Sequence, residues 1–344
     1  MAGLNSAEEM AVALVTGATG FIGGHLVKRL HENGDTVRCL VRATSARKPL
    51  EPYVSEFVVG DLRKPNSVVR SVQGVDVVYH LAGATRGFGQ GDFDDINVDA
   101  LREFAVVCAA QPNPPRFVHI SSLAAAGISP IGSPRNESLP MNPVSQYGIS
   151  KKRGEQVLRG FAKQLAISIV RPPVVFGPGD MDSLQLFRPI KRLRVNPIPI
   201  NRRRQCSFVA VEDLVEALVA VAGNGKRISE SVDDADGVYF VADPNLISFK
   251  EFGQMIARSI GNKWVWTVTI IRPAVWGTAA VNEVIARIKG KQSVMNFDKA
   301  REVCAGSWTC SPEKIQNELK FEPQKTLQER FNDTISWYVD HGLM

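Results

Sequence analysis

The sequence predicts an α/β protein built on a doubly wound parallel sheet, with a smaller and mostly helical C-terminal part. From residue 11 to about 175, short apolar runs alternate with segments of helical periodicity. Several runs are apolar at consecutive positions, which is typical of parallel strands covered on both faces. The length of 344 residues allows one large domain, or two that share a core.

The individual elements follow from these patterns. The predicted strands cover residues 11–15, 36–41, 56–59, 75–81, 116–120 and 166–170, and the helices between them cover 22–33, 96–110 and 146–164. A strand and helix are expected again over 207–221, and a further strand over 237–242. From residue 245 the chain is predicted to be mainly helical. Its last helix carries an apolar stripe expected to pack in the core, made of Leu327, Phe331, Ile335 and Tyr338.

Composition and charge narrow the class of protein. Apolar residues make up 44% and charged residues 22%, as in ordinary soluble proteins. No apolar run approaches the roughly 20 residues of a membrane span, and the first ten residues form no signal peptide, so we expect a cytoplasmic protein with no membrane partner. The net charge of +6 comes without the signatures of nucleic-acid binding. Five scattered cysteines lack zinc spacing, so we expect reduced thiols and no metal.

A glycine turn follows the first predicted strand. Thr16–Gly23 reads TGATGFIG, so Gly17, Gly20 and Gly23 lie between a strand and a helix. Such glycines permit a tight turn, a close approach of the backbone to a pyrophosphate and close helix–strand packing, while the N–H groups at the helix start face the phosphate. The turn therefore predicts a dinucleotide site.

The second strand indicates which dinucleotide binds. NAD sites usually carry Asp or Glu there to bond the ribose 2′-hydroxyl, whereas this strand ends at Arg42. A guanidinium suits a 2′-phosphate, so we expect NADP(H), with NAD(H) as the alternative. Asp61, followed by Leu62, either accepts from the adenine amino group or caps a helix. Leu81, Ala82 and Gly83 end the fourth strand, at the edge where such sheets hold ligands.

Two later segments carry groups suited to proton transfer. Ser122 follows the strand over 116–120, and Tyr147 and Lys151 lie one turn apart on the helix that starts at 146. A phenol titrates near 10, and a neighbouring ammonium would lower that pKa and make Tyr147 a usable general acid/base. Ser122 could hold the substrate oxygen against the phenol.

Together, TGATGFIG, Ser122, the Tyr147/Lys151 pair and RPPVVFGPGD at 171–180 resemble the extended short-chain dehydrogenase/reductase family, over nearly the whole chain. The resemblance implies a Rossmann-type fold with Ser122, Tyr147 and Lys151 as the catalytic triad, and Asn97 as a helix asparagine of the site. It also implies hydride transfer at a secondary alcohol or ketone, and a homodimer formed by the helices over 96–110 and 146–164. The cofactor residues that it implies are Gly17, Gly20, Phe21, Ile22, Gly23, Asp61, Leu62, Ala82, Gly83, Lys151, Pro172 and Val175.

Departures from the family pattern bear on the reaction. Sugar epimerases of the family usually carry hydroxyl residues where this chain has Ala124 and Ala126, and dehydratases place Asp-Glu where it has Leu123-Ala124. We therefore expect an NADP-dependent oxidoreductase. An NDP-sugar 4-epimerase is the alternative among enzymes, and a non-catalytic NADP-sensing protein is the alternative outside them.

The sequence also predicts the domain bounds and the residues that would contact the substrate. The predicted sheet domain spans 11–180 and 206–244, after a loose tail over 1–10, and a substrate-binding cap spans 181–205 and 245–344. The loop over 86–95 is a candidate lid, and a small-molecule substrate is expected to meet Thr85, Arg86, Ser122 and Arg188. Arg188 opens a basic stretch without acids that extends to Arg204, which either grips a diphosphate or forms a solvated face.

Overall fold

The computed structural model describes residues 10–199, 203–290, 292–293 and 295–344. Its centre is a seven-stranded sheet with the order β11-β6-β5-β4-β1-β2-β3, in which every neighbouring pair is parallel. The strands are β1 (Val12–Thr16), β2 (Thr36–Val41), β3 (Glu56–Val59), β4 (Val77–His80), β5 (Arg116–Ile120), β6 (Ile167–Arg171) and β11 (Val238–Phe240). The predicted doubly wound sheet is confirmed.

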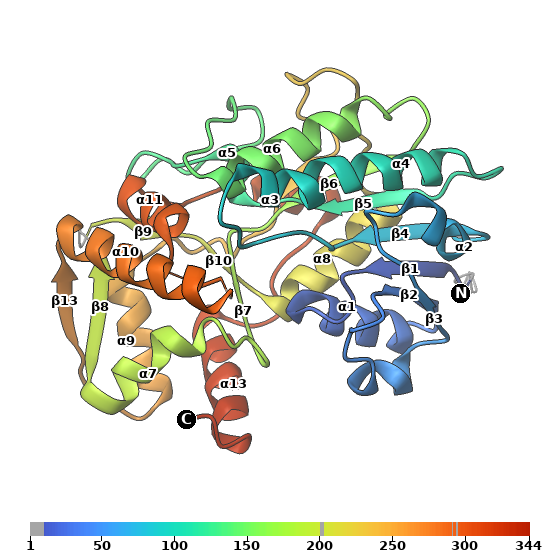
Figure 1. Ribbon diagram of the computed structural model, residues 1–344. Helices are drawn as coiled ribbons and strands as arrows, with labels where there is room; N and C mark the ends of the chain where they lie inside the picture. Colours follow the sequence, from blue (N-terminus) through green and yellow to red (C-terminus); the bar gives the residue numbers. More distant parts are fainter. Residues whose placement is uncertain (1–9, 200–202, 291, 294) are drawn as a thin grey trace.

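Helices cover both faces of the sheet (Figure 1). On one face lie α1 (Phe21–Glu32) and α8 (Val211–Asn224), whose Leu26 and Leu214 share a core with the strands. On the other lie α4 (Leu101–Ala109) and α6 (Gln146–Arg159), whose Phe104 and Leu158 belong to a second core. The short helices on the connections are α2 (Val69–Val72), α3 (Gln90–Asp94), α5 (Leu123–Ala126) and three further turns, η1 (Lys48–Tyr53), η2 (Pro65–Ser67) and η3 (Asp95–Ala100).

A second group of elements lies beside the carboxyl ends of the strands (Figure 1). It contains α7 (Leu184–Leu193), α9 (Phe249–Ser259), α10 (Arg272–Lys289), α11 (Phe297–Ala305) and the parallel pair β8 (Val195–Pro199) and β13 (Trp266–Ile270). We call this group the cap. Two small pairs connect it to the sheet: β7 (Val174–Phe176) with β10 (Phe208–Ala210), and β9 (Gln205–Cys206) with β12 (Ile247–Ser248).

An aromatic core joins the cap to the last helix, α13 (Leu327–Asp340). Phe331 stacks on Phe176 at 4.3 Å between ring centroids, and Phe208 stacks on Phe252 at 4.9 Å. All four residues of the predicted C-terminal stripe are buried here. The preceding helix, α12 (Glu313–Leu319), instead packs its Ile315 into the core of the sheet, although its residues fall in the range expected for the cap.

All five cysteines are buried and unpaired. Among the described residues, no helix combines the length and the hydropathy needed to cross a bilayer.

Candidate active site

The glycine turn has the close packing that the sequence predicts. Gly17 has a φ of +71°, and a Cβ there would lie 2.7 Å from the backbone nitrogen of Ala82. A Cβ on Gly23 would lie 2.2 Å from the carbonyl oxygen of Gly17. Neither position therefore has room for a side chain, and α1 starts close to the ends of β1 and β4. The backbone of residues 17–23 is thus uncovered at the edge of the sheet, and we call this segment the cradle.

The start of α1 is suited to an anion. Its first residue is Phe21, its N-cap is Gly20, and no side chain in the described part of the chain caps it. The first turn also contains no acidic residue. Uncapped N–H groups at a helix start, together with the positive end of the helix dipole, favour phosphate. The cradle therefore fits the pyrophosphate of a dinucleotide, which Gly20, Phe21, Ile22 and Gly23 would hold.

The ends of the second and third strands carry charged groups. Arg42 is exposed directly after β2, and its backbone N–H donates to Ser45 at 3.1 Å. Arg63 donates to the carboxylate of Asp61 at 2.7 and 3.1 Å, and this contact lowers the Asp61 pKa to about 2. The helix after Asp61 starts beyond Lys64 without a side-chain cap, so the prediction that Asp61 caps a helix is wrong.

A cavity of about 150 Å³ opens at the carboxyl ends of β4 and β5. It brings together predicted site residues from six separate parts of the sequence, because parallel strands end at the same edge of the sheet. The predicted residues that line it are Ile22, Leu81, Gly83, Thr85, Asn97, Ser122, Tyr147, Lys151, Pro172 and Val175.

Tyr147 lies in the first turn of α6 and is hydrogen-bonded to Ser122. Burial raises the pKa of Tyr147 to about 12, the Ser122 hydrogen bond opposes this, and Glu302 and Lys299 act in opposite directions. The expected lowering of the Tyr147 pKa by Lys151 is therefore wrong for this structure. The physical reason is that desolvation outweighs the neighbouring donors, and the cation that acts on the phenol belongs to the cap.

Lys151 is buried beneath the cavity. Its ammonium donates to the carbonyl oxygen of Ile120 at 2.6 Å, and burial lowers its pKa to about 8, against an opposing effect of Glu155. Glu155 is itself held by Arg171, at 2.6 and 2.9 Å, and accepts from the hydroxyl of Ser121. Lys151 therefore lies beside a buried hydrogen-bonded network, and its pKa of about 8 allows it to lose its charge just above neutral pH.

Asn97 occupies η3, a π-helical turn. Its side-chain oxygen accepts from the backbone nitrogen of Ala84 at 2.8 Å, and its amide donates to Ala84 and to Ser150 at 2.9 Å each. The asparagine therefore connects the loop after β4 to the helix that carries Tyr147. A Cβ on Gly83 would lie 3.0 Å from the Asn97 oxygen, so this junction is packed without spare room.

Two residues of the cap that reach this site were not among the residues predicted from the sequence. Asp298 of α11 accepts from the backbone nitrogen of Gln146 at 2.7 Å and from that of Tyr147 at 3.0 Å. Glu302 accepts from Ser145 at 2.7 Å and from Lys299 at 2.8 Å. In the sequence these side chains have the spacing of ordinary surface ion pairs on a helix, and only the fold shows where that surface lies.

The predicted substrate residues divide into two groups. Thr85 lines the cavity, whereas Arg86 binds the carboxylate of Asp182 at 2.6 Å, which joins the candidate lid to the loop after β7. Phe93 of the same loop is buried with its ring 6.1 Å from that of Tyr147. Arg188 lies on the exposed face of α7 and does not line the cavity.

The described residues of the basic stretch do not line the cavity. Arg204 is buried and donates to the carbonyl oxygens of Val303 and Cys304, and Arg194 lies over the ring of Trp264. These contacts hold the cap together and leave neither guanidinium at the cavity. Arg202 lies outside the described residues.

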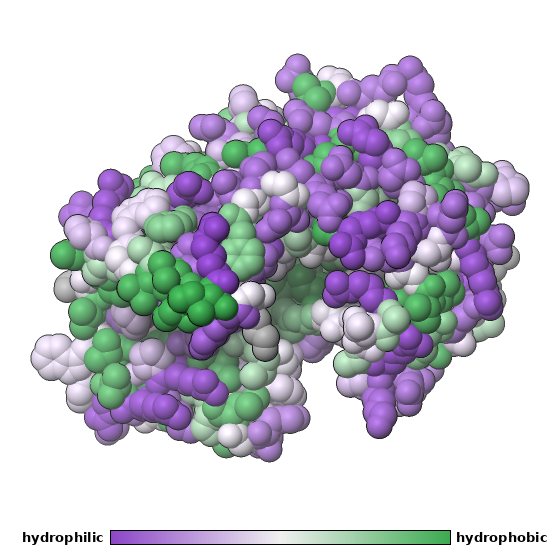
Figure 2. All heavy atoms as spheres, in the orientation of Figure 1, coloured by the Kyte–Doolittle hydropathy of each residue, from purple (hydrophilic) through white to green (hydrophobic). Residues whose placement is uncertain are grey.

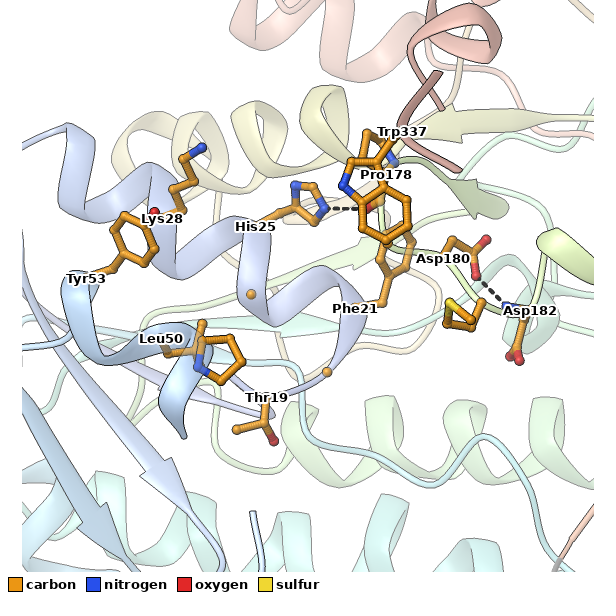
Figure 3. A pocket seen from close by; sticks show the side chains of 15 residues that line it. Thr19, Phe21, His25, Lys28, Leu50, Tyr53, Pro178, Asp180, Asp182 and Trp337 are labelled. Carbon is orange, nitrogen blue, oxygen red and sulfur yellow. Dashed lines mark hydrogen bonds between the residues drawn. The ribbon is translucent and has the colours of Figure 1, made fainter. Parts of the chain in front are cut away.

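A wider hollow of about 720 Å³ lies on the outer side of α1 (Figure 3). Phe21 and His25 of α1 face it together with Trp337, and His25 donates to the carbonyl oxygen of Pro178 at 2.8 Å. The hollow shares Gly20 and Phe21 with the phosphate cradle, so it opens directly beside the proposed cofactor path.

The glycine cradle, the uncapped helix start and the cavity define a dinucleotide-binding enzyme. The model of the NAD dependent epimerase/dehydratase family matches residues 13–232. The chain belongs to this family, in agreement with the resemblance stated above. The family and its relatives are NAD(P)-dependent reductases, epimerases and dehydratases.

Three relatives show the range of the family. A ceramide reductase of Caulobacter vibrioides is 31% identical, over 96% of this chain and 95% of its own. A UDP-glucose 4-epimerase of Vibrio cholerae is 24% identical, over 95% of each chain. The structure of MoeE5 in complex with UDP-glucuronic acid and NAD superimposes with a TM-score of 0.72 at 25% identity, over 96% of this chain and 99% of that one.

Proposed function

We propose that the chain is an NADPH-dependent reductase that acts reversibly on a ketone, or on the corresponding secondary alcohol, of a lipid-like molecule. The observation that carries this proposal is the single cavity that holds Ser122, Tyr147, Lys151 and Asn97 beside the glycine cradle. The lipid-like substrate is taken from the ceramide reductase, which matches nearly the whole chain.

Each residue has a role in this chemistry. The dinucleotide, held on the cradle, would supply a hydride to the carbonyl carbon. Ser122 and Tyr147 donate hydrogen bonds to the carbonyl oxygen, and Tyr147 gives up its proton as that oxygen gains negative charge. A Tyr147 pKa near 12 keeps the phenol protonated at neutral pH, as reduction requires. The Lys151 ammonium stabilises the phenolate that remains.

The preference for NADPH is supported by Arg42. It is exposed at the end of β2, where the family usually has a carboxylate in NAD-binding members. A guanidinium pairs with a phosphate in two parallel hydrogen bonds, which a ribose hydroxyl cannot match. The same proposal places the enzyme in the cytoplasm, where thiols such as the five buried cysteines stay reduced.

The proposed oligomer is a homodimer built from α4 and α6. The two helices lie side by side on one face of the sheet, and Val106 of α4 is half exposed there. Light scattering on the purified protein tests this, since a monomeric mass would remove the dimer.

The test follows NADPH absorbance with three substrate classes: a long-chain amino ketone related to ceramide, a steroid ketone and UDP-glucose. We expect net oxidation of NADPH with a lipid ketone, and a loss of about 10²- to 10⁴-fold in Tyr147→Phe. Conversion of UDP-glucose to its epimer without net cofactor turnover would replace the reductase by the epimerase. Full activity of Tyr147→Phe on its best substrate would remove the proton-transfer role.

A further inference from the structure

An apolar stripe runs along the exposed face of α10. The exposed fractions of Val281, Val284, Ile285 and Ile288 are 60%, 57%, 42% and 80%. Their spacing of i, i+3, i+4 and i+7 places them on one face, one above another. Figure 2 shows this face as a green cluster at the position of α10, beside the hollow between the cap and the sheet. Large aliphatic side chains rarely gather uncovered on a soluble protein without a partner.

The exposed charged side chains of α10 itself are all positive. The one acidic residue of α10, Glu283, is buried and binds Arg287 at 2.9 Å. The exposed charged side chains of the helix are therefore Arg287 and Lys289, at the end of the stripe, and Arg272, which donates to the carbonyl oxygen of Cys304 in α11 at 3.2 Å. An amphipathic helix whose apolar face is bordered by cations has the composition of helices that lie in the headgroup layer of anionic membranes.

Further large side chains are exposed in the segment that leads into α10. Trp264 and Trp266 lie just before the helix and are 50% and 66% exposed, and Ile271 between them and the helix is 65% exposed. Arg194 lies over Trp264 with its guanidinium 4.9 Å from the ring centroid. Tryptophan and arginine are the side chains that favour the boundary between lipid and water, because each has an apolar body and a polar end.

We propose that the stripe on α10 docks the protein on an anionic membrane surface. A second copy of the chain is the competing occupant, but α10 presents no exposed acidic side chain that could pair with these cations across a symmetric contact. Anionic headgroups neutralise the same cations. The charge pattern therefore favours the membrane.

The docked face lies next to the active site. α10 packs against α11, whose Asp298 binds the start of the helix that carries Tyr147. Arg287 of α10 lies over Phe88 of the candidate lid, 5.6 Å from its ring centroid. Docking through α10 would thus bring the lid toward the lipid surface. This differs from the sequence-based expectation of no membrane partner, because the sequence did not show which face of α10 stays uncovered.

The first test is cosedimentation of the full-length protein with vesicles. Vesicles of phosphatidylcholine are compared with vesicles that also contain phosphatidylglycerol. We expect binding to the anionic vesicles, weakened by salt, and a loss of about tenfold or more in I285N/I288N. The matched control is I131N/V232N, which changes two side chains that are 55% exposed elsewhere on the surface. This control should bind like the parent.

Three results would overturn the proposal. In the first, the parent protein stays in the supernatant with anionic vesicles. In the second, I285N/I288N binds the vesicles like the parent. In the third, I285N/I288N changes the oligomeric mass of the protein without changing vesicle binding. The last result would assign the face to a second copy of the chain. NADPH affinity and the melting temperature of the variant should match the parent, because neither exposed side chain reaches the cradle.

A second measurement reads the contact directly. The native cysteines are buried, so Ile288→Cys can be labelled selectively with an environment-sensitive dye. Its emission should shift to the blue on anionic vesicles, while the same dye on Val232→Cys should not respond. No shift at Ile288→Cys would contradict docking through α10. Neither measurement depends on turnover, so the outcome is separate from that of the reductase proposal.

Discussion

The contact between α11 and α6 leads to a sharp prediction for Asp298→Asn. In the parent, Asp298 accepts from the first two N–H groups of α6, and Ser145 accepts from the third at 3.0 Å. The first three N–H groups of α6 therefore all have side-chain acceptors, and Asp298 of α11 accepts two of the three hydrogen bonds. Asparagine has nearly the same volume, but it retains one acceptor and turns an amide N–H toward the other donor.

The expected loss can be worked from these contacts. Asp298 is only 8% exposed, so a lost bond is not replaced by water. One hydrogen bond to a charged group contributes about 1.5–3 kcal/mol. A carboxylate at a helix N-terminus adds about 0.3–2 kcal/mol. The desolvation of the carboxylate offsets part of this sum, which leaves a destabilisation of about 2–3 kcal/mol. A shift of the Tyr147 oxygen by about 1 Å would lower kcat/KM by about 100-fold.

Urea unfolding and steady-state kinetics measure the two effects. Asp236→Asn is the control, because Asp236 makes an exposed ion pair with Lys226 away from the cavity and its loss should cost less than about 1 kcal/mol. If Asp298→Asn unfolds within about 0.5 kcal/mol of the parent and keeps its kcat, the cap does not position the phenol.

Three other outcomes follow from the site. Arg42→Glu should weaken NADPH binding by about 10- to 100-fold and spare NADH, and equal losses in a fluorescence titration would exclude a phosphate contact. Because the Lys151 pKa is lowered to about 8, kcat/KM for reduction should fall as pH rises through 8 and the ammonium is lost; a level profile to about pH 10 would refute this. Gly23→Ala should weaken NADPH binding by more than about tenfold, because its Cβ would lie 2.2 Å from the Gly17 oxygen. Gly24→Ala is the control and should bind NADPH normally in the same titration, because the nearest atom to its Cβ, in Leu50, would be 3.9 Å away.

Strands were predicted accurately where consecutive apolar residues mark a strand covered by helices. The runs over 36–41, 56–59 and 116–120 have the predicted bounds, because strands of a parallel sheet covered by helices carry apolar residues at consecutive positions. Helices were predicted less accurately at their ends. The helix expected over 146–164 stops at Arg159, followed by Gly160, and the one expected over 96–110 begins as the π-helical turn η3. Apolar periodicity does not distinguish a π-helical turn from an α-helix over so short a segment.

The part of the candidate site that could be predicted, the glycine cradle and the cavity residues, follows from short sequence patterns. A glycine that no side chain can replace, and polar residues that follow strands of one parallel sheet, mark the cradle and the cavity without knowledge of the fold. The pKa of Tyr147 did not follow, because it depends on how deeply the phenol is buried and on Glu302 and Lys299, some 150 residues away in the sequence.

The cap residues show why spacing alone was insufficient there. Asp298 and Arg301, like Lys299 and Glu302, have the i, i+3 spacing of ion pairs on any exposed helix, and both pairs form in the structure. Their second contacts, to Ser145 and Tyr147, exist only because α11 lies across the start of α6. The same packing decides which face of α10 is covered by α11 and which stays exposed. A single tertiary arrangement therefore positions the proposed proton donor and exposes the proposed membrane-docking face, and neither could be inferred from the helices taken one at a time.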